Sequence, residues 1–295
     1  MASEVHHRPN APLLTAADPP PVTVENPNGR SQFLLIGDHA GNVIPSRLDS
    51  LGVSADDLQR HIGWDIGIAG LGTLLAEAMD APFIRQTYSR LVVDCNRRPD
   101  APDAMPPVSD GTAIPGNAHL SADARAARVA AIHAPYHQAI GAEIARRRTD
   151  GRGTIVIALH SFTPALKDGA ARPWQIGVLH DGGEARFALR LLETLRRECS
   201  LVVGDNEPYR MDLIDYTVPR HCYPAGLPYA ELEVRQDLIA DDAGRRRYAA
   251  LLLEAIERTA SAPAPAGKQA RPHGSARRAL PCGRAEGQRP KESRR

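Results

Sequence analysis

Residues 154–162 read TIVIALHSF, and this stretch decides the fold class of the chain. Its first six residues are apolar or β-branched without alternation, which is typical of a strand that is buried on both faces of a sheet. The polar residues His160 and Ser161 follow directly, where such a strand should end. The stretch therefore predicts an α/β sheet with chemically useful side chains at the carboxyl end of a strand.

Apolar runs and helical patterns alternate on both sides of this strand. Further strands are predicted at residues 33–36 (FLLI), 82–86, 90–93, 176–179, 201–203 and 230–234. Amphipathic spacing predicts helices at residues 66–79, 187–197 and 245–258, and a long helix that is N-capped by Ser121. The alternation indicates an α/β fold with a mixed, largely parallel sheet that is flanked by helices on both faces.

The two ends of the chain differ in composition from its body. Residues 1–30 are rich in proline and asparagine and predict an irregular segment, whereas residues 31–260 form the predicted domain. Residues 261–295 contain nine lysines and arginines against two acids, and we expect this basic tail to be disordered. Since the net charge is only +1, the body is acidic, which argues against a nucleic-acid-binding domain.

The sequence also indicates in which cellular compartment the protein is expected. It has no apolar run of the roughly 18 residues that a membrane span needs, and no basic start followed by an apolar stretch. Its four cysteines form no CxxC pair, so free thiols in a reducing compartment are expected. We therefore expect a soluble, cytoplasmic protein.

Polar side chains gather where the predicted strands end. His39 follows FLLI, His160 follows TIVIAL, and Glu233 lies in the strand near residue 230. Imidazole and carboxylate groups can hold a zinc ion with one position open for an activated water molecule. His133 and His137 stand four apart on a predicted helix, but Pro135 lies between them and no HExxH motif is present, so a solvated or satisfied helix face is the better interpretation.

Two other nucleophiles are disfavoured. Cys95 has no neighbouring histidine in its motif, so a buried thiol is expected. Ser161 lacks the G-x-S-x-G elbow of serine hydrolases. Asp94 is expected either to take part in the site or only to orient Arg90 or Arg97 through a buried ion pair.

Six motifs, taken in this order, resemble the N-formylglutamate amidohydrolase family. They are DHAGNVIP at 38–45, HIGWDIG at 61–67, YSRLVVDCNR at 88–97, ALHSFTP at 158–164, VGDNEPY at 203–209 and ELEVRQDLI at 231–239. The likeness extends over about residues 30–258. It implies a fold similar to that of zinc carboxypeptidases and of the aspartoacylase group.

The resemblance also implies roles for individual residues. His39 and His160 are similar to the first and last zinc ligands, and Glu233 to the general base that passes a proton from water to the leaving amine. Arg90, in R-x-x-x-D-x-N-R, would stabilise the oxyanion. Asn96 and Arg97 would hold a substrate carboxylate, and Arg235 is expected to help bind the substrate.

One position departs from the pattern of zinc carboxypeptidases. Their glutamate ligand stands three residues after the first histidine, where this chain has Asn42. We expect Asp65, in GWDIG, to be the third metal ligand, and Asp38 is the alternative. If neither serves, the site would bind metal weakly or prefer another ion.

The sequence therefore predicts a zinc-dependent amidohydrolase that releases an amino acid from a small N-acyl, possibly N-formyl, derivative such as N-formylglutamate, in amino acid catabolism. The alternatives are hydrolysis of another N-acyl amino acid or a small peptide, and a non-catalytic protein that binds anions on the same fold. We expect one zinc ion, a small-molecule substrate, no nucleic acid or membrane partner, and a monomer or small homo-oligomer.

Overall fold

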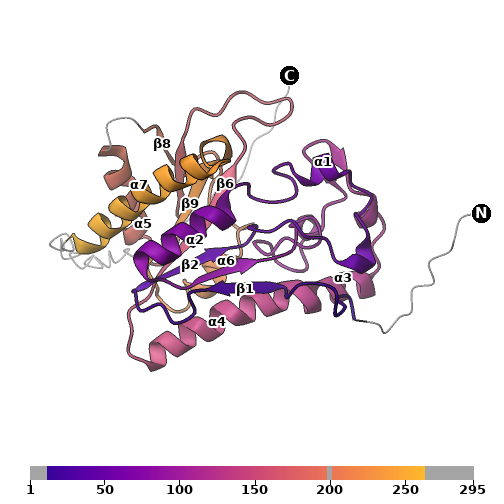
Figure 1. Ribbon diagram of the computed structural model, residues 1–295, viewed down its shortest axis with the longest axis horizontal. Coiled ribbons are helices and arrows are strands. Elements are labelled where there is room, and N and C mark those ends of the chain that lie inside the picture. The colour runs from indigo at the N-terminus through magenta and orange to yellow at the C-terminus, as the bar shows by residue number, and fades with distance from the viewer. Residues whose placement is uncertain (1–11, 198–200, 263–295) are drawn as a thin grey trace, which may run out of the picture. The chain divides into compact units, whose positions relative to one another are not determined.

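A computed structural model describes residues 12–197 and 201–262 of the chain, and its centre is a seven-stranded sheet (Figure 1). The strand order is β1-β3-β2-β6-β9-β7-β8. The strands are β1 (Val22–Glu25), β2 (Phe33–Gly37), β3 (Phe83–Gln86), β6 (Ile155–Phe162), β7 (Ile176–Leu179), β8 (Val203–Asp205) and β9 (Tyr229–Arg235). Only the pairs β1–β3 and β7–β9 are antiparallel, so the predicted mixed, largely parallel sheet is confirmed.

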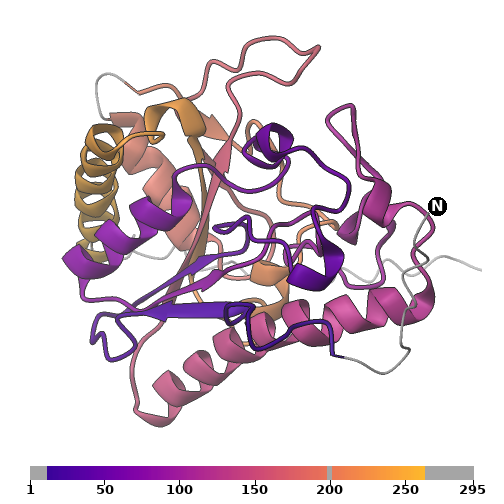
Figure 2. The same ribbon diagram turned by 45° about the vertical axis from the view of Figure 1, so that its right-hand side comes forward.

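Helices cover both faces of this sheet, as predicted (Figures 1 and 2). The α-helices are α1 (Ala55–Leu58), α2 (Ile68–Met79), α3 (Ala122–Arg128), α4 (Ala134–Thr149), α5 (Arg186–Arg197), α6 (Thr217–His221) and α7 (Asp242–Ser261). A π-helical turn, Val129–His133, joins α3 to α4, and Ser121 accepts a hydrogen bond from the backbone of Ala124 as the expected N-cap. The smaller elements are the hairpin β4 (Val108–Ser109) and β5 (Thr112–Ala113) and the 3₁₀ turns Ser46–Leu48, Pro102–Ala104, Pro115–Asn117 and Gln236–Leu238.

Two apolar clusters hold these layers together. One face of the sheet packs against α2, α5 and α7 through side chains such as Leu71, Leu191 and Leu252, which are fully buried. The other face packs against α4 and the π-helical turn through Tyr136 and Ile140. Because both faces are covered, the central strands are apolar along most of their length, which is the pattern that residues 154–159 display.

The side chains of β6 and β9 change character along one face of the sheet. Val156, Ala158 and Tyr229 contribute to the cluster under α4. His160 lies two residues beyond Ala158, and Glu231 two beyond Tyr229, so strand alternation places them on the same face. Apolar residues thus fill the middle of this face, whereas histidine and carboxylate groups occupy its carboxyl end.

Three predictions about the elements were wrong. Residues 90–93 form turns, with the amide of Val92 bonded to the carbonyl of Ser89, although Leu91, Val92 and Val93 are buried under α4. The segment 1–30 is not wholly irregular, because Val22–Glu25 pairs with β3. His160 lies inside β6 rather than after it, since pairing with β9 extends that strand to Phe162.

The compact unit that contains the sheet ends at Ser261. Most of the predicted tail, from residue 263 onward, lies outside the described residues, as do Cys199 and Cys282. In the described part of the chain no helix has the length and apolar character needed to cross a membrane.

Candidate active site and metal centre

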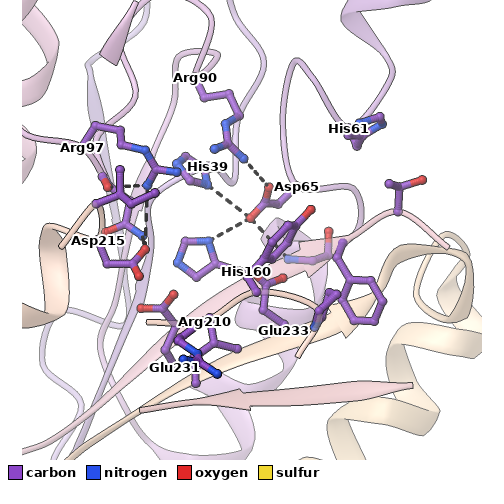
Figure 3. A pocket seen from close by; sticks show the side chains of 18 of the residues that line it. His39, His61, Asp65, Arg90, Arg97, His160, Arg210, Asp215, Glu231 and Glu233 are labelled. Carbon is purple, nitrogen blue, oxygen red and sulfur yellow. Dashed lines mark hydrogen bonds and ion pairs between the residues drawn. The ribbon is translucent and has the colours of Figure 1, made fainter. Parts of the chain in front are cut away.

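A cavity of about 420 Å³ lies where β2, β6 and β9 end, and polar side chains dominate its deepest part (Figure 3). Seven of the eight residues predicted to form the site line this cavity; they are His39, Asp65, Arg90, Asn96, Arg97, His160 and Glu233. They come from segments that are far apart in the sequence. The carboxyl end of the sheet thus brings them together, as expected for an α/β fold.

His39, Asp65 and His160 form a compact buried group at the bottom of the cavity. Asp65 Oδ2 lies 3.0 Å from His160 Nδ1 and 3.4 Å from His39 Nδ1. One potential ligand atom from each residue lies within 4.8 Å of the others, and none of the three residues is more than 3% exposed. This buried group could bind a metal ion.

The turn that carries Asp65 is fixed by the backbone. The amide of Asp65 donates a 2.8 Å hydrogen bond to the carbonyl of His39. Two residues later Gly67 adopts φ = 88°, and a Cβ atom there would meet the carbonyl oxygen of Ile239 at 2.4 Å. Only glycine satisfies both conditions, so the motif GWDIG is explained by the close approach of this turn to the loop after β9.

Each histidine of the group also contacts a second carboxylate through its other ring nitrogen. His39 Nε2 forms a 2.7 Å hydrogen bond with Asp94 Oδ1, and His160 Nε2 lies 3.1 Å from Asp38 Oδ2. Asp38 is itself held by the hydroxyl of Thr217 at 2.6 Å. A carboxylate behind a metal-ligating histidine orients the ring and increases its basicity. Asp65 faces the Nδ1 atoms of both histidines, whereas Asp38, the alternative third ligand, lies next to His160 Nε2.

These residues fit a zinc ion. His39 Nδ1 and His160 Nε2 are buried and have no hydrogen-bond partner among the described residues, which is the state expected of a nitrogen that donates its lone pair to a metal, whereas His160 Nδ1 is hydrogen-bonded to Asp65. Two imidazoles and one carboxylate are the ligand set of many catalytic zinc sites. Burial alone would lower the pKa of His160, but Asp38 and Asp65 raise this pKa well above its ordinary value, so the carboxylates favour positive charge at this place.

Arg90 extends over the same group from the loop after β3. Its Nε and Nη2 atoms donate to Asp94 Oδ2 at 3.1 and 2.7 Å, and its Nη1 lies 3.6 Å from Asp65 Oδ1. Burial opposes the charge of Arg90, but Asp94 and Asp65 outweigh it and raise the pKa of the guanidinium. Arg90 thus remains a cation, and its Nη1 atom is directed toward the buried group of His39, Asp65 and His160.

Asn96 and Arg97, which were expected to hold a substrate carboxylate, use most of their hydrogen-bonding groups within the protein. Asn96 Oδ1 accepts hydrogen bonds from the amides of Tyr216 and Thr217, both at 2.9 Å, and Nδ2 donates to Asp215 Oδ1 at 3.1 Å. Arg97 uses Nε for Asp103 and Nη1 for the carbonyl of Asn96. Asn96 therefore positions the segment before α6, whereas the Nη2 atom of Arg97 keeps donors that are not used within the described residues.

Two glutamates of β9 face the cavity on the side of His160. Glu233 is the β-sheet partner of His160, and Glu231 lies two residues earlier on the same face of β9. Both carboxylates are buried, and the Oε2 atom of each has no hydrogen-bond partner among the described residues. Burial raises the pKa of Glu233 to about 7, although the charge of His160 acts in the opposite direction. Glu233 can therefore bind and release a proton near neutral pH.

Arg235 is placed elsewhere. Its guanidinium pairs with Asp237 at 2.8 Å and contacts the carbonyl of Arg172, and it does not line the cavity. Arg235 lies two residues after Glu233, but it is bonded at the end of β9, where the chain enters a 3₁₀ turn. Asn42 does not line the cavity either.

The helix histidines are buried and satisfied rather than solvated. His133 Nε2 bonds to the carbonyl of Arg97 at 3.0 Å, and His137 Nε2 to that of Cys95 at 2.9 Å. They therefore hold the backbone of the segment that carries Asn96. Cys95 is a free, buried thiol, as predicted, and burial raises its pKa well above the ordinary value.

Several cavity residues lacked a predicted role, among them Glu231 and Asp215. Glu231 could have been found from the sequence, because strand alternation places residues two apart on one face. Asp215 had no such signal, since it lies in an irregular segment that the sequence does not relate to Asn96, its hydrogen-bond partner in the cavity.

The chain is similar to known proteins over most of its length. The family described as N-formylglutamate amidohydrolase matches residues 31–240. The crystal structure of gene product Atu2144 from Agrobacterium tumefaciens is 38% identical and superposes with a TM-score of 0.81, covering 84% of this chain and 98% of that one. The N-formylglutamate amidohydrolase of Ralstonia eutropha JMP134 is 22% identical with a TM-score of 0.61, covering 81% and 98%. No curated protein matches the sequence.

Proposed function

Because the chain belongs to the N-formylglutamate amidohydrolase family and is an amidohydrolase, we propose that it uses one zinc ion to hydrolyse the amide bond of a small N-acyl amino acid. The products are a carboxylic acid and the free amino acid. The observation that carries the proposal is the buried group of His39, Asp65 and His160 in the same cavity as Glu233. We also propose that the protein acts in the cytoplasm, in amino acid catabolism.

His39, Asp65 and His160 would hold the zinc ion. When bound, the ion supplies Lewis acidity that makes a water molecule more acidic and polarises the acyl carbonyl. Asp94 and Asp38 keep the two imidazole rings oriented through their Nε2 atoms. In this arrangement the Nδ1 atoms of both rings face Asp65, so the three proposed metal ligands lie close together.

Glu233 is the proposed general base. Its raised pKa of about 7 allows the carboxylate to take a proton from the attacking water and to give it to the leaving nitrogen. The same proton is thus moved twice, and the amine leaves as a neutral group. Because Glu233 is paired with His160 across the sheet, its position is fixed by the register of β6 and β9.

Arg90 is the proposed stabiliser of the oxyanion. Asp94 fixes its Nε and Nη2 atoms, so the remaining Nη1 group is preorganised beside Asp65. A donor that is fixed in advance stabilises the charge that develops on the acyl oxygen without reorganising during the reaction.

Arg97 is the proposed contact for the substrate carboxylate. Its Nη2 group can donate to an anion, while Nε and Nη1 are held by Asp103 and by the carbonyl of Asn96. Asn96 supports this site by fixing Asp215 and the start of α6 rather than by gripping the substrate.

The proposal is tested by a metal analysis and a substrate screen. We expect about one equivalent of zinc in the purified protein, and hydrolysis of at least one member of a panel of N-formyl, N-acetyl and N-succinyl amino acids, with and without added zinc. A Glu233→Gln variant, which keeps the metal-binding group, serves as the inactive control. If the protein binds no zinc and hydrolyses no member of the panel after zinc is added, the proposal is wrong.

A further inference from the structure

We infer that Glu231 and Asp215 form a subsite that selects N-acyl amino acids with a positively charged side chain over those with a negatively charged one. The inference rests on the proposed function and specifies its substrate class. It therefore predicts that glutamate derivatives are poor substrates, although the family is named after one.

Glu231 is a buried carboxylate with no protein partner. It is 2% exposed, it lines the cavity, and its Oε2 atom has no hydrogen-bond partner within residues 12–197 and 201–262. No lysine, arginine or histidine of that part of the chain forms an ion pair with it. Figure 3 shows its carboxyl group directed into the cavity, on the side where Asp215 and His160 lie.

Asp215 presents a second carboxylate from the segment before α6. Its oxygens accept hydrogen bonds from Asn96 Nδ2 and from the amide of Asp212, both at 3.1 Å. The nearest cation is Arg97, whose Nη1 lies 3.8 Å away and which also pairs with Asp103 at 2.9 Å. Asp215 is therefore fixed in place while its negative charge is only partly neutralised.

The two carboxylates influence each other. Burial raises the pKa of Glu231 well above its ordinary value, and the charges of Asp215 and Glu233 raise it further, against the effect of His160. Burial also raises the pKa of Asp215. Unpaired buried carboxylates destabilise a protein, and an opposite charge between them removes that cost. The ammonium or guanidinium group of a substrate side chain would provide this charge.

A carboxylate on the substrate side chain would have the opposite effect. Like charges within a few ångströms repel each other, and they do so more strongly beside a buried carboxylate than in water. The cavity is not acidic throughout, because Arg90, Arg97 and Arg210 line it as well. Arg90 and Arg97 are suited to the α-carboxylate. Glu231, together with Asp215, which Arg97 approaches at 3.8 Å, is suited to a basic side chain.

The first test compares three substrates that carry the acyl group found in the screen and differ only in side chain. We expect kcat/KM for the lysine derivative to exceed that for the glutamate derivative by about tenfold or more, with the norleucine derivative between them. In Glu231→Gln the ratio of lysine to norleucine should fall by about tenfold, as should the ratio in Asp215→Asn. The control Asp100→Asn removes one exposed charge that pairs with Arg98, and it should leave the ratio unchanged.

The second test does not depend on turnover. Titration calorimetry of the chelator-treated protein with lysine, norleucine and glutamate should show the tightest binding for lysine, and Glu231→Gln should remove that preference. Equal ratios in the wild type and Glu231→Gln, or a preference for glutamate, would overturn the inference even if the protein is an amidohydrolase. If nothing is hydrolysed, the proposed function fails, and the calorimetry still decides the inference.

Discussion

Replacing Asp94 by asparagine should weaken both the metal site and the fold. Asp94 is 4% exposed, and its two oxygens serve different partners, with Oδ1 bonded to His39 and to the amide of Asn96 and Oδ2 to Arg90. Every one of these partners is a donor. An asparagine side chain has only one acceptor oxygen, so its NH₂ group must face a donor on one side.

The magnitude follows from these contacts. Loss of a carboxylate behind a metal-ligating histidine typically lowers metal affinity by about 10- to 100-fold, which corresponds to roughly 1.4–2.8 kcal/mol. Removing one partner of a buried ion pair costs about 3–5 kcal/mol. The side chain of Arg90 is 28% exposed, so water can replace part of the lost interaction. We therefore expect the free energy of unfolding to fall by about 3 kcal/mol, at the low end of that range.

Two measurements on the purified variant check this reasoning. Competition with a chromophoric chelator gives the zinc affinity, and urea denaturation of the chelator-treated protein gives the free energy of unfolding. The matched control is Asp100→Asn, an aspartate on the same segment whose pair with Arg98 is exposed and should contribute about 0–1 kcal/mol. Zinc affinity within twofold of the wild type would refute the role of Asp94 behind His39.

Four further results are expected. Glu233→Gln should lower kcat by about 10²- to 10⁴-fold while the zinc content stays at the wild-type level, and a variant with more than a tenth of the activity would contradict the role of Glu233 as the base. In the metal-free protein the pKa of Glu233 is raised from 4.5 to about 7, so between these pH values the folded state binds more protons than the unfolded state, and the free energy of unfolding falls as the pH rises. At pH 8 Glu233→Gln should therefore be more stable than the wild type, by on the order of 3 kcal/mol. Equal denaturation midpoints of the two proteins would argue against this. Zinc at about 100 times its Kd should raise the free energy of unfolding by about 2.7 kcal/mol in the wild type and by nothing in His160→Ala, as thermal denaturation with and without zinc will show. Cys95 should not react with a maleimide under native conditions because it is 1% exposed with a raised pKa, and rapid labelling detected by mass spectrometry would contradict that burial.

The sheet could be predicted from the sequence because its central strands are buried on both faces. A continuous apolar run such as residues 155–159, in a chain with no membrane-length apolar stretch, is typical of a strand that helices cover on both sides. Leu91–Val93 is also an apolar run, but there a turn buries three apolar side chains against α4 without sheet pairing. An apolar run indicates that its residues are buried, but it does not show that they form a strand. Short apolar runs in loops are therefore easily mistaken for strands.

The group of His39, Asp65 and His160 could be predicted in part. His39 and His160 come directly after apolar runs that predict strands, and this position suggested a shared edge of the sheet. Asp65 was preferred to Asp38 as third ligand, but the sequence could not show which ring nitrogen of each histidine these carboxylates meet. Arg235 was placed wrongly for a similar reason, since the pairing with Asp237 directs its side chain away from the cavity.

The bond between Asp65 and His160 joins residues 95 positions apart, and this has a consequence for biosynthesis. Chains are made from the N-terminus, so His39 and Asp65 emerge from the ribosome well before the strand that completes their group. Until β6 has been made, Asp38 lacks its contact with His160, whereas the partners of Asp94 (His39, Arg90 and the amide of Asn96) are already part of the chain. The group of His39, Asp65 and His160 is therefore completed only after more than half of the chain has been made.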